Sequence, residues 1–122
     1  MAIQISPSQL EIYRKTARER EAVLRKQVME RREHAWELAH QAAVILKEEF
    51  GASRVVVFGS LIHPERFHFY SDIDLGVWDV ENYFRAVARL IDLDPQIEFD
   101  LVPIEDAWPG ILAVIEEEGM DL

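Results

Sequence analysis

The sequence contains no cysteine among its 122 residues. This absence excludes disulfide bonds, thiol catalysis and cysteine-ligated zinc, and it is compatible with a reducing cytoplasm. Long apolar runs are also absent, since no stretch approaches the roughly 20 residues that a membrane-spanning helix needs. The N-terminus, MAIQISPSQLEIYRK, lacks a positive segment followed by an apolar one, so we expect no secretory leader. These absences predict a cytoplasmic protein that does not bind a membrane.

Basic residues are scarce outside one segment of the chain. Thirteen Lys and Arg stand against 23 Asp and Glu, for a net charge of −10. Residues 1–36 hold eight of the basic residues and five acidic ones, so they carry about +3 and the remainder carries about −13. An acidic body disfavours direct binding of nucleic acid, because affinity for phosphate backbones comes mostly from clustered Lys and Arg. A polyanionic ligand would therefore bind only with metal ions in between.

A single long helix is predicted at the start of the chain, which is short enough to form one domain. Ser6 can cap this helix, Pro7 fits its first position, and Gln9 can complete a capping box. No helix-breaking residue follows until Gly51, so the helix would span residues 7–50 and measure about 66 Å at 1.5 Å per residue. A domain of this size is narrower than that, so the helix must bend, break or protrude.

The two halves of this helix differ in pattern. The second half carries the stripe of a core-facing helix, formed by Ala35, Leu38, Ala39, Ala42, Ile45 and Leu46. In the first half a weaker seam of Leu10, Ala17, Leu24 and Val28 is interrupted by Arg14, Glu21 and Arg31. We therefore divide the chain into an N-terminal helical extension, residues 1–34, and a folded domain, residues 35–122. The extension is either a solvated helix with scattered ion pairs or an arm that binds a partner or itself.

Three strands and two further helices are expected after Gly51. Strand signals cover residues 54–58, 72–78 and 97–102. Residues 82–91 predict a helix whose inward face is formed by Phe84, Val87, Ala88 and Ile91. Residues 110–118 predict a last helix that presents Ile111, Leu112, Val114 and Ile115. This order of elements indicates an α/β or α+β domain in which helices flank a small sheet.

Two aspartates lie one residue apart in the second predicted strand, DIDLGVW. Because alternate side chains of a strand point to opposite faces, Ile73, Leu75 and Val77 would face the core. Asp72 and Asp74 would then share the other face, where two like charges repel each other by up to about 1 kcal/mol. A divalent cation between the two carboxylates would turn that repulsion into attraction.

The third predicted strand has one carboxylate in the centre of its apolar run, QIEFDLV. Asp100 is this residue, and we prefer it to Glu98 because Glu98 lies nearer the start of the strand. If the second and third strands are neighbours, Asp72, Asp74 and Asp100 converge on one face. Such an all-oxygen set suits Mg²⁺, which favours carboxylates, water and substrate phosphates.

A Gly-Ser pair follows the first predicted strand, RVVVF. Gly59 lets the backbone approach a phosphate closely, and the hydroxyl of Ser60 adds a donor to the peptide N–H groups of the turn. A Gly-Ser pair alone is more often an ordinary turn. The pair becomes specific when it is combined with Asp72, Asp74 and Asp100.

This combination resembles the signature of the polymerase-β-type nucleotidyltransferase superfamily: Gly-Ser, a spacer, Asp-x-Asp and a further aspartate on a later strand. The segments FGS and SDIDLGV are similar to those of its minimal (MNT) members, and the resemblance runs from about Ala35 to Leu122. The closing IEEEGMDL is similar to the helix-Gly-apolar ending of the family. MNT proteins are commonly the antitoxins of HEPN/MNT toxin–antitoxin systems.

The resemblance implies a polymerase-β-like fold and a role for each matching residue. Gly59 and Ser60 would bind the triphosphate, Asp72 and Asp74 would hold two Mg²⁺ ions, and Asp100 would hold the catalytic ion and accept a hydroxyl proton. The implied activity is Mg²⁺-dependent transfer of AMP from ATP to a tyrosine of a HEPN ribonuclease toxin, in a hetero-oligomer with that toxin. Two alternatives stay open: neutralisation of the toxin by binding alone, and transfer to another acceptor.

The sequence departs from the family pattern in the loop after Gly59. The spacer Leu61–Ser71 has eleven residues, one more than is common, and Leu-Ile-His-Pro replaces the usual Arg and Gly. The triphosphate would lose a cation there, which Arg66 or a partner residue would have to supply. With no cation, the chain would be an antitoxin that binds without much turnover.

The remaining histidines and aromatic residues are expected to have structural roles. No zinc-type spacing connects the histidines, so we expect surface or loop positions for His34, His40, His63 and His68. The tryptophans are expected to pack against the sheet: Trp36, Trp78 and Trp108. Phe67, Phe69 and Tyr70 would anchor the spacer loop in the core, with contact to a partner as the alternative.

Overall fold

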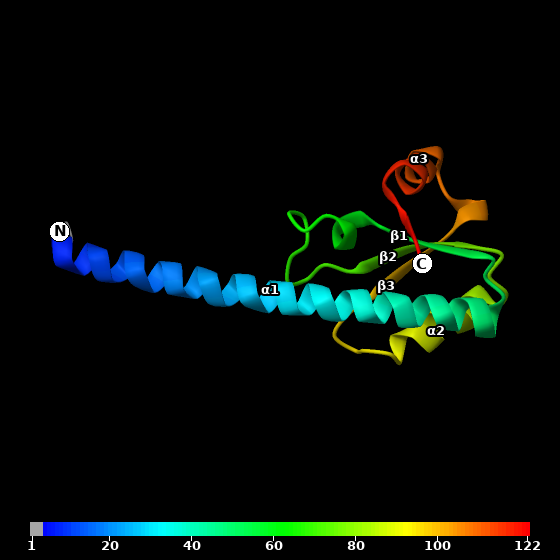
Figure 1. The fold of residues 1–122 in the computed structure, drawn as a ribbon, viewed down its shortest axis with the longest axis horizontal. Helices are drawn as coiled ribbons and strands as arrows, with labels where there is room; N and C mark the ends of the chain where they lie inside the picture. Colours follow the sequence, from blue (N-terminus) through cyan, green and yellow to red (C-terminus); the bar gives the residue numbers. More distant parts are fainter. Residues whose placement is uncertain (1–3) are drawn as a thin grey trace.

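The computed structural model describes residues 4–122 (Figure 1). The elements follow one another as α1 (Pro7–Phe50), β1 (Arg54–Phe58), the 3-10 turn η1 (Gly59–Ile62), β2 (Ile73–Trp78), α2 (Tyr83–Ile91), β3 (Phe99–Pro103), the turn η2 (Ile104–Asp106), α3 (Pro109–Glu118) and β4 (Met120–Asp121). The strands form one sheet in the order β3-β2-β1-β4. β1 is antiparallel to β2 and β4, whereas β2 is parallel to β3. The predicted fold class, a small mixed sheet flanked by helices, is confirmed.

Helix α1 is continuous over its whole length and protrudes from the body of the protein (Figure 1). The predicted capping box is present, since the Gln9 N–H donates to Ser6 Oγ at 3.2 Å and the Ser6 N–H donates to Gln9 Oε1 at 3.0 Å. The helix ends at Gly51, whose φ of 72° is left-handed and which glycine adopts without steric strain. The division proposed at residue 34 falls inside this uninterrupted helix.

The second half of α1 and helix α2 cover one face of the sheet (Figure 1). The predicted stripe of α1 is confirmed, with Ile45 partly buried and the other members fully buried. It packs against the alternate strand residues Val55, Val57, Ile73, Leu75 and Val77, all with no exposed surface. Because these strand residues share one face of the sheet, they and the helices form a single core.

Helix α3 covers the opposite face of the sheet (Figure 1). The helix comes so close that a Cβ at Gly76 would lie 3.0 Å from Ile115 Cδ1. Ile115 is the residue of α3 that is buried. The chain then turns at Gly119 into β4, a short strand that the sequence did not predict, and Leu122 donates its N–H to the Val55 carbonyl at 2.9 Å. The segment after α3 thus completes one edge of the sheet.

The predicted inward face of α2 was wrong except at Val87, which packs against the core. Phe84 and Ile91 are 84% and 63% exposed, whereas Ala86 and Leu90 are fully buried. Two sets of residues on this helix have the spacing of a core face, so periodicity alone did not decide which side of the helix turns toward the sheet. The rotation that occurs lets the Tyr83 hydroxyl donate to the Leu101 carbonyl at 2.8 Å.

Strand limits also differ slightly from the sequence prediction. β2 begins at Ile73 and β3 at Phe99, so Asp72 and Glu98 come immediately before the strands. β3 extends to Pro103, one residue beyond the predicted end. Asp72 has no hydrogen-bonded partner on a neighbouring strand. Its side chain is therefore less firmly held to one face of the sheet than that of Asp74.

The aromatic predictions were partly right. Trp36 and Trp78 are partly buried, but Trp108 is 78% exposed because it lies at the N-cap of α3 and outside the sheet. In the spacer loop Phe67 is the core anchor at 6% exposed, whereas Phe69 and Tyr70 are 46% and 81% exposed. The histidines occupy exposed or partly exposed positions, as predicted for His34, His40, His63 and His68.

Among residues 4–122, no helix combines the length and the apolar character that crossing a bilayer requires.

Candidate functional site

The aspartates lie at the end of the sheet where β1 stops and β2 and β3 start. Asp74 is the register partner of Asp100 in the parallel pair and of Phe58 in the antiparallel pair. Register partners on adjacent strands point to the same face, about 4.8 Å apart. The predicted neighbourhood of the two strands is therefore correct, and it places the Asp74 and Asp100 carboxylates side by side. This face is the one that α3 covers farther along, at Gly76.

The pKa of Asp74 is raised from its ordinary value of 3.8 to about 6. Burial is the largest cause, because a partly buried carboxylate loses hydration that stabilises its charge. The negative charge of Asp100 is the next cause, and that of Asp72 the third. The three carboxylates thus act on one another electrostatically, although Asp72 and Asp100 are exposed and Asp74 is half-buried.

The backbone of Gly59 lies directly against the Asp74 carboxylate. Its φ of 76° is left-handed, and a Cβ at this position would collide with Asp74 Oδ2. Position 59 therefore needs glycine for two reasons. Its backbone conformation disfavours other residues, and the Asp74 carboxylate leaves no room for a Cβ. Ser60 follows in the same turn, and both residues are partly exposed. The structure thus brings the Gly-Ser pair and the aspartates to one place.

An arginine of α1 fastens this turn to the body. Arg32 donates from Nε and Nη2 to the Leu61 carbonyl at 3.0 and 2.7 Å. The Leu61 side chain is fully buried, so the turn is held from both sides. Charge-assisted bonds from one guanidinium to one carbonyl limit the movement of η1 relative to α1. Sequence reasoning missed Arg32, because no spacing rule connects it to a turn 29 residues later in the chain.

Tyr83 of α2 lies within electrostatic reach of Asp100. Burial is the main cause of its raised pKa, and the charge of Asp100 adds to it. Its hydroxyl hydrogen bond to the Leu101 carbonyl fixes the ring next to β3. No sequence pattern indicated this contact beyond an aromatic residue at the start of a helix.

The spacer loop places no cation within a hydrogen bond of the aspartates. His63 Nε2 lies 3.2 Å from Glu118 Oε2, so this histidine joins the loop to the end of α3. Arg66 is exposed in the turn that follows. The site is therefore negative and open, with its potential cationic partners at the edge of the loop.

Oxygen ligands are present, but they are not gathered around one point. In the part of the chain that the structure describes, no three His, Cys, Asp or Glu side chains already form a metal cluster. Asp74 and Asp100 are nevertheless in register, and Asp72 is close enough to raise the Asp74 pKa. The donor type is that of a hard divalent cation such as Mg²⁺.

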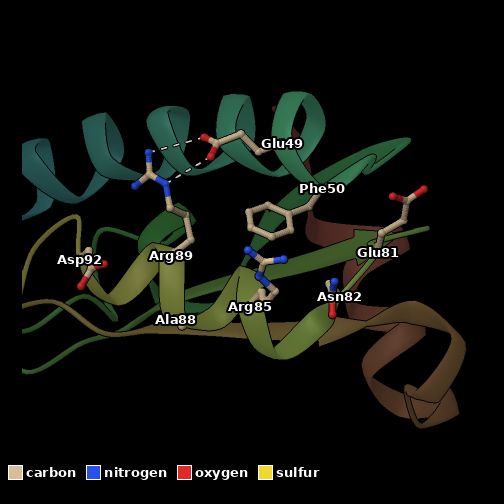
Figure 2. Close-up of a pocket in the computed structure, with 8 residues that line it drawn as sticks. All are labelled: Glu49, Phe50, Glu81, Asn82, Arg85, Ala88, Arg89 and Asp92. Carbon is tan, nitrogen blue, oxygen red and sulfur yellow. Dashed lines mark hydrogen bonds and ion pairs between the residues drawn. The ribbon is translucent and has the colours of Figure 1, made fainter.

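A separate hollow of about 460 Å³ lies between α1 and α2 (Figure 2). Its lining mixes charges of both signs, and Arg89 pairs there with Glu49 at 3.4 Å. The hollow belongs to the face of the sheet that α1 and α2 cover, whereas the aspartates point to the other face. The hollow therefore contributes no side chain to the aspartate site.

Comparisons with known proteins identify the fold. No family model matches the chain, and no curated protein matches it in sequence. A chain of a crystal structure of the toxin–antitoxin MntA-HpeT, as a mutant with two Asp-to-Glu replacements, is similar with a TM-score of 0.55 and 17% identity over 68% of this chain and 70% of that one. The chain has the fold of this toxin–antitoxin chain.

A second solved structure, a toxin–antitoxin with AMP-PNP, agrees with the first. Its TM-score is 0.55, with 19% identity over 66% of this chain and 69% of that one. Identities this low show the fold alone. The expected likeness to MNT antitoxins, which rested on the Gly-Ser pair and the aspartates, is thus confirmed for the fold.

Proposed function

We propose that this chain is the antitoxin of a HEPN ribonuclease and that it transfers AMP from ATP to a tyrosine of that toxin. The observation that carries the proposal is the pairing of Asp74 and Asp100 in register above the left-handed Gly59. The charge of Asp74 is unfavourable in the fold, because burial first, and then the charges of Asp100 and Asp72, raise its pKa. Electrostatic repulsion that folding does not require is typical of a functional site.

The proposed ATP position follows from the turn at Gly59 and Ser60. Backbone N–H groups in such a turn bind phosphate oxygens, and Ser60 adds a hydroxyl donor. The nucleotide analogue in one of the similar toxin–antitoxin structures supports a nucleotide as the ligand of this fold. The paired aspartates of the other, mutant structure share the spacing of Asp72 and Asp74, which supports the proposed importance of this pair.

The carboxylates fit Mg²⁺ by their chemistry and by the cradle at Gly59 that a Cβ would fill. Asp72 and Asp74 would hold two ions, with Asp100 as a further ligand of the catalytic one. Bound Mg²⁺ would neutralise the carboxylates and polarise the α-phosphate. Burial, and then the charges of Asp100 and Asp72, raise the pKa of Asp74, and a bound cation would offset the repulsion among the three carboxylates.

The transfer step assigns a separate task to Asp100. The tyrosine oxygen of the toxin forms a bond to the α-phosphorus, the bond from that phosphorus to the β-phosphate oxygen breaks, and pyrophosphate leaves. Asp100 is exposed at the start of β3, where an incoming hydroxyl can reach it, and it accepts the tyrosine proton. Gly59 and Ser60 keep the triphosphate in place during this step.

Neutralisation by binding alone is the second candidate, and one observation favours it. The residue after Ser60 is Leu61, which is fully buried and cannot place a charge beside the triphosphate. The nearest basic residue of the loop, Arg66, is exposed and three residues beyond His63. A site that lacks a phosphate-binding cation would turn over slowly while keeping its binding surface.

Intact-mass spectrometry of the toxin tests the proposal. The toxin would be incubated with this chain, ATP and Mg²⁺, beside the variants Asp74→Asn and Asp100→Asn. We expect the wild type to add AMP groups to the toxin and each variant to lower the rate at least about 100-fold, because each removes a charged group from the transition state. Asp92→Asn, an exposed acid at the end of α2, is the matched control and should leave the rate unchanged.

Ribonuclease assays on the same samples separate the two candidates. Toxin that stays unmodified but is inhibited equally by the wild type and by both variants would refute transfer and establish binding alone. Modified toxin with loss of inhibition in the variants would establish transfer as the means of neutralisation.

A further inference from the structure

The first part of α1 leaves the body of the protein, and Val28 at its end is the residue that packs against the core. We call residues 7–28 the arm; the residues of the arm are exposed except Thr16 and Val28, which are partly exposed. Leu10, Tyr13 and Leu24 are 40%, 65% and 57% exposed. Together with Ala17 they are spaced three, four and seven residues apart, in line with the buried stripe of the second half of α1. We call this set the arm stripe. Leu24 borders a hollow that Pro64 and Phe67 of the spacer loop also line, and the rest of the stripe lies farther out on the arm.

Arginines border the arm stripe on both sides. Arg14 is four residues from Leu10, and Arg20 is four residues from Leu24, so both lie beside the stripe on the helix surface. Lys15 and Lys26 lie on the opposite side of the helix at 100° per residue. The arm as a whole has six basic and three acidic residues. Its preferred partner is therefore an apolar surface with acidic neighbours.

Helix α3 carries such a surface. Trp108, Ile111 and Val114 are 78%, 37% and 40% exposed and follow one another at helical spacing. Asp106 and Glu117 are exposed acidic residues of the same region. The segment 104–122 contains six acidic residues and no Lys or Arg. We call Trp108, Ile111 and Val114 with these acids the α3 patch.

The arm cannot reach the α3 patch of its own chain. The arm continues α1 without a break and leads away from the body, and α3 lies on the other side of the sheet from α1 (Figure 1). A rigid helix that points away from the body can meet an α3 patch only on another molecule. Two arms would repel each other through their net positive charge, so pairing of arm with arm is disfavoured.

We propose that two copies of this chain form a dimer in which the arm of each copy packs on the α3 patch of the other. Two reciprocal contacts of the same kind are what a two-fold axis generates, so the assembly closes at two subunits. The arm stripe covers the apolar residues of the α3 patch, while Arg14 and Arg20 meet its acidic residues. The dimer requires neither ATP nor a toxin, so it is independent of the proposed transfer activity.

Crosslinking is the first test, and the lack of native cysteine makes it specific. Full-length Ala17→Cys and Val114→Cys proteins would be mixed and oxidised under mild conditions. We expect the mixture to form a disulfide-linked dimer at least ten times faster than either variant alone, because residue 17 of one copy lies against residue 114 of the other. Ala17→Cys combined with Glu48→Cys, an exposed site on the outer side of α1, is the matched control.

Charge reversal is the second test. In sedimentation equilibrium we expect wild-type protein to approach twice the 14.2 kDa monomer mass as concentration rises. Arg14→Glu with Arg20→Glu should weaken the dimer at least tenfold, as should Asp106→Lys with Glu117→Lys. All four changes together should restore it. Lys15→Glu with Lys26→Glu changes the net charge equally on the opposite side of the arm and should leave the dimer intact.

Three outcomes would overturn the proposal. The first is a monomer at every concentration, with no crosslink in the mixture. The second is a dimer that crosslinks through Ala17→Cys alone, which would indicate arm-to-arm pairing. The third is a dimer that the control pair of lysine changes weakens as much as the arginine changes do. Circular dichroism of each variant shows whether a loss of dimer reflects a loss of fold.

Discussion

The two faces of β2 come from the same six residues and have opposite physical character. On one face Ile73, Leu75 and Val77 are fully buried against α1 and α2. On the other face Asp74 and Gly76 follow each other, one beside Asp100 and the other beneath α3. The first face stabilises the fold, whereas the second holds a carboxylate whose charge burial disfavours. One face of β2 is thus wholly apolar, whereas the other packs against α3 at Gly76 and is left for chemistry at Asp74.

The largest effect is expected on the apolar face. Leu75→Ala removes a fully buried side chain at the centre of the sheet and should lower the free energy of unfolding by about 2–5 kcal/mol. The matched change Leu24→Ala, at a residue 57% exposed on the arm, should change it by less than about 0.5 kcal/mol. Urea unfolding at low protein concentration measures both. Equal losses from the two variants would contradict the assignment of Leu75 to the core.

An intermediate effect is expected where the polar face meets the turn. Gly59→Ala forces a left-handed residue to carry a Cβ and pushes that atom into the Asp74 carboxylate, so we expect a loss of about 1–3 kcal/mol in stability. ATP binding in the presence of Mg²⁺ should weaken as well. Gly110→Ala is the control, since a Cβ there meets nothing within 4 Å. It should leave stability unchanged or raise it by up to about 1 kcal/mol; a similar loss in both variants would mean that Gly59 is not special.

The smallest effect is expected from the protonation of Asp74. Its pKa is about 6 in the folded protein against an ordinary value of 3.8, so between these pH values the folded state keeps a proton that the unfolded state has released. The contribution of the protonated Asp74 to the free energy of unfolding is therefore fully present below about pH 4, and it is lost as the pH rises through 6. Because the carboxyl keeps partial contact with solvent, we expect a loss of about 1–2 kcal/mol.

Asp74→Asn isolates this contribution, because asparagine resembles the protonated acid at every pH. Without Mg²⁺, the variant should match the wild type at pH 4 and exceed its stability at pH 7 by about 1–2 kcal/mol. Urea unfolding at both pH values measures the difference. A variant that is less stable than the wild type at pH 7 would show that the Asp74 charge supports the fold, contrary to the comparison of the two faces.

Much of the fold followed from local chemistry. Ser6, Pro7 and Gly51 mark the ends of α1 through capping and backbone freedom, which act within a few residues. Strand alternation around Asp74 assigned its neighbours to the core correctly, because a half-buried strand has a period of two. Gly59 and Asp100 could be selected as site residues from the same local patterns, before their proximity was known.

Errors arose where several elements meet. Two stripes on α2 had the spacing of a core face, and the rotation that occurs buries Ala86 and Leu90 in the core and brings the Tyr83 hydroxyl to a carbonyl of β3. Strand β4 has two residues and forms only because the chain leaves α3 beside β1. Arg32 fixes the turn at Leu61 through a contact between residues far apart in the chain. None of these depends on spacing within a segment.

The sequence by itself determined the helix limits, the apolar face of each strand and the set of carboxylates that could hold a metal, because these depend on side-chain type and short-range periodicity. Only the tertiary structure decided that Asp74 stands beside Asp100, that Gly59 lies beneath Asp74, and that the arm extends beyond the body. The physical reason is that register and burial are set by the packing of whole elements. Asp74 acquires its raised pKa mainly from burial and from Asp100 on the adjacent strand, and its neighbour in the chain, Asp72, adds the smallest part.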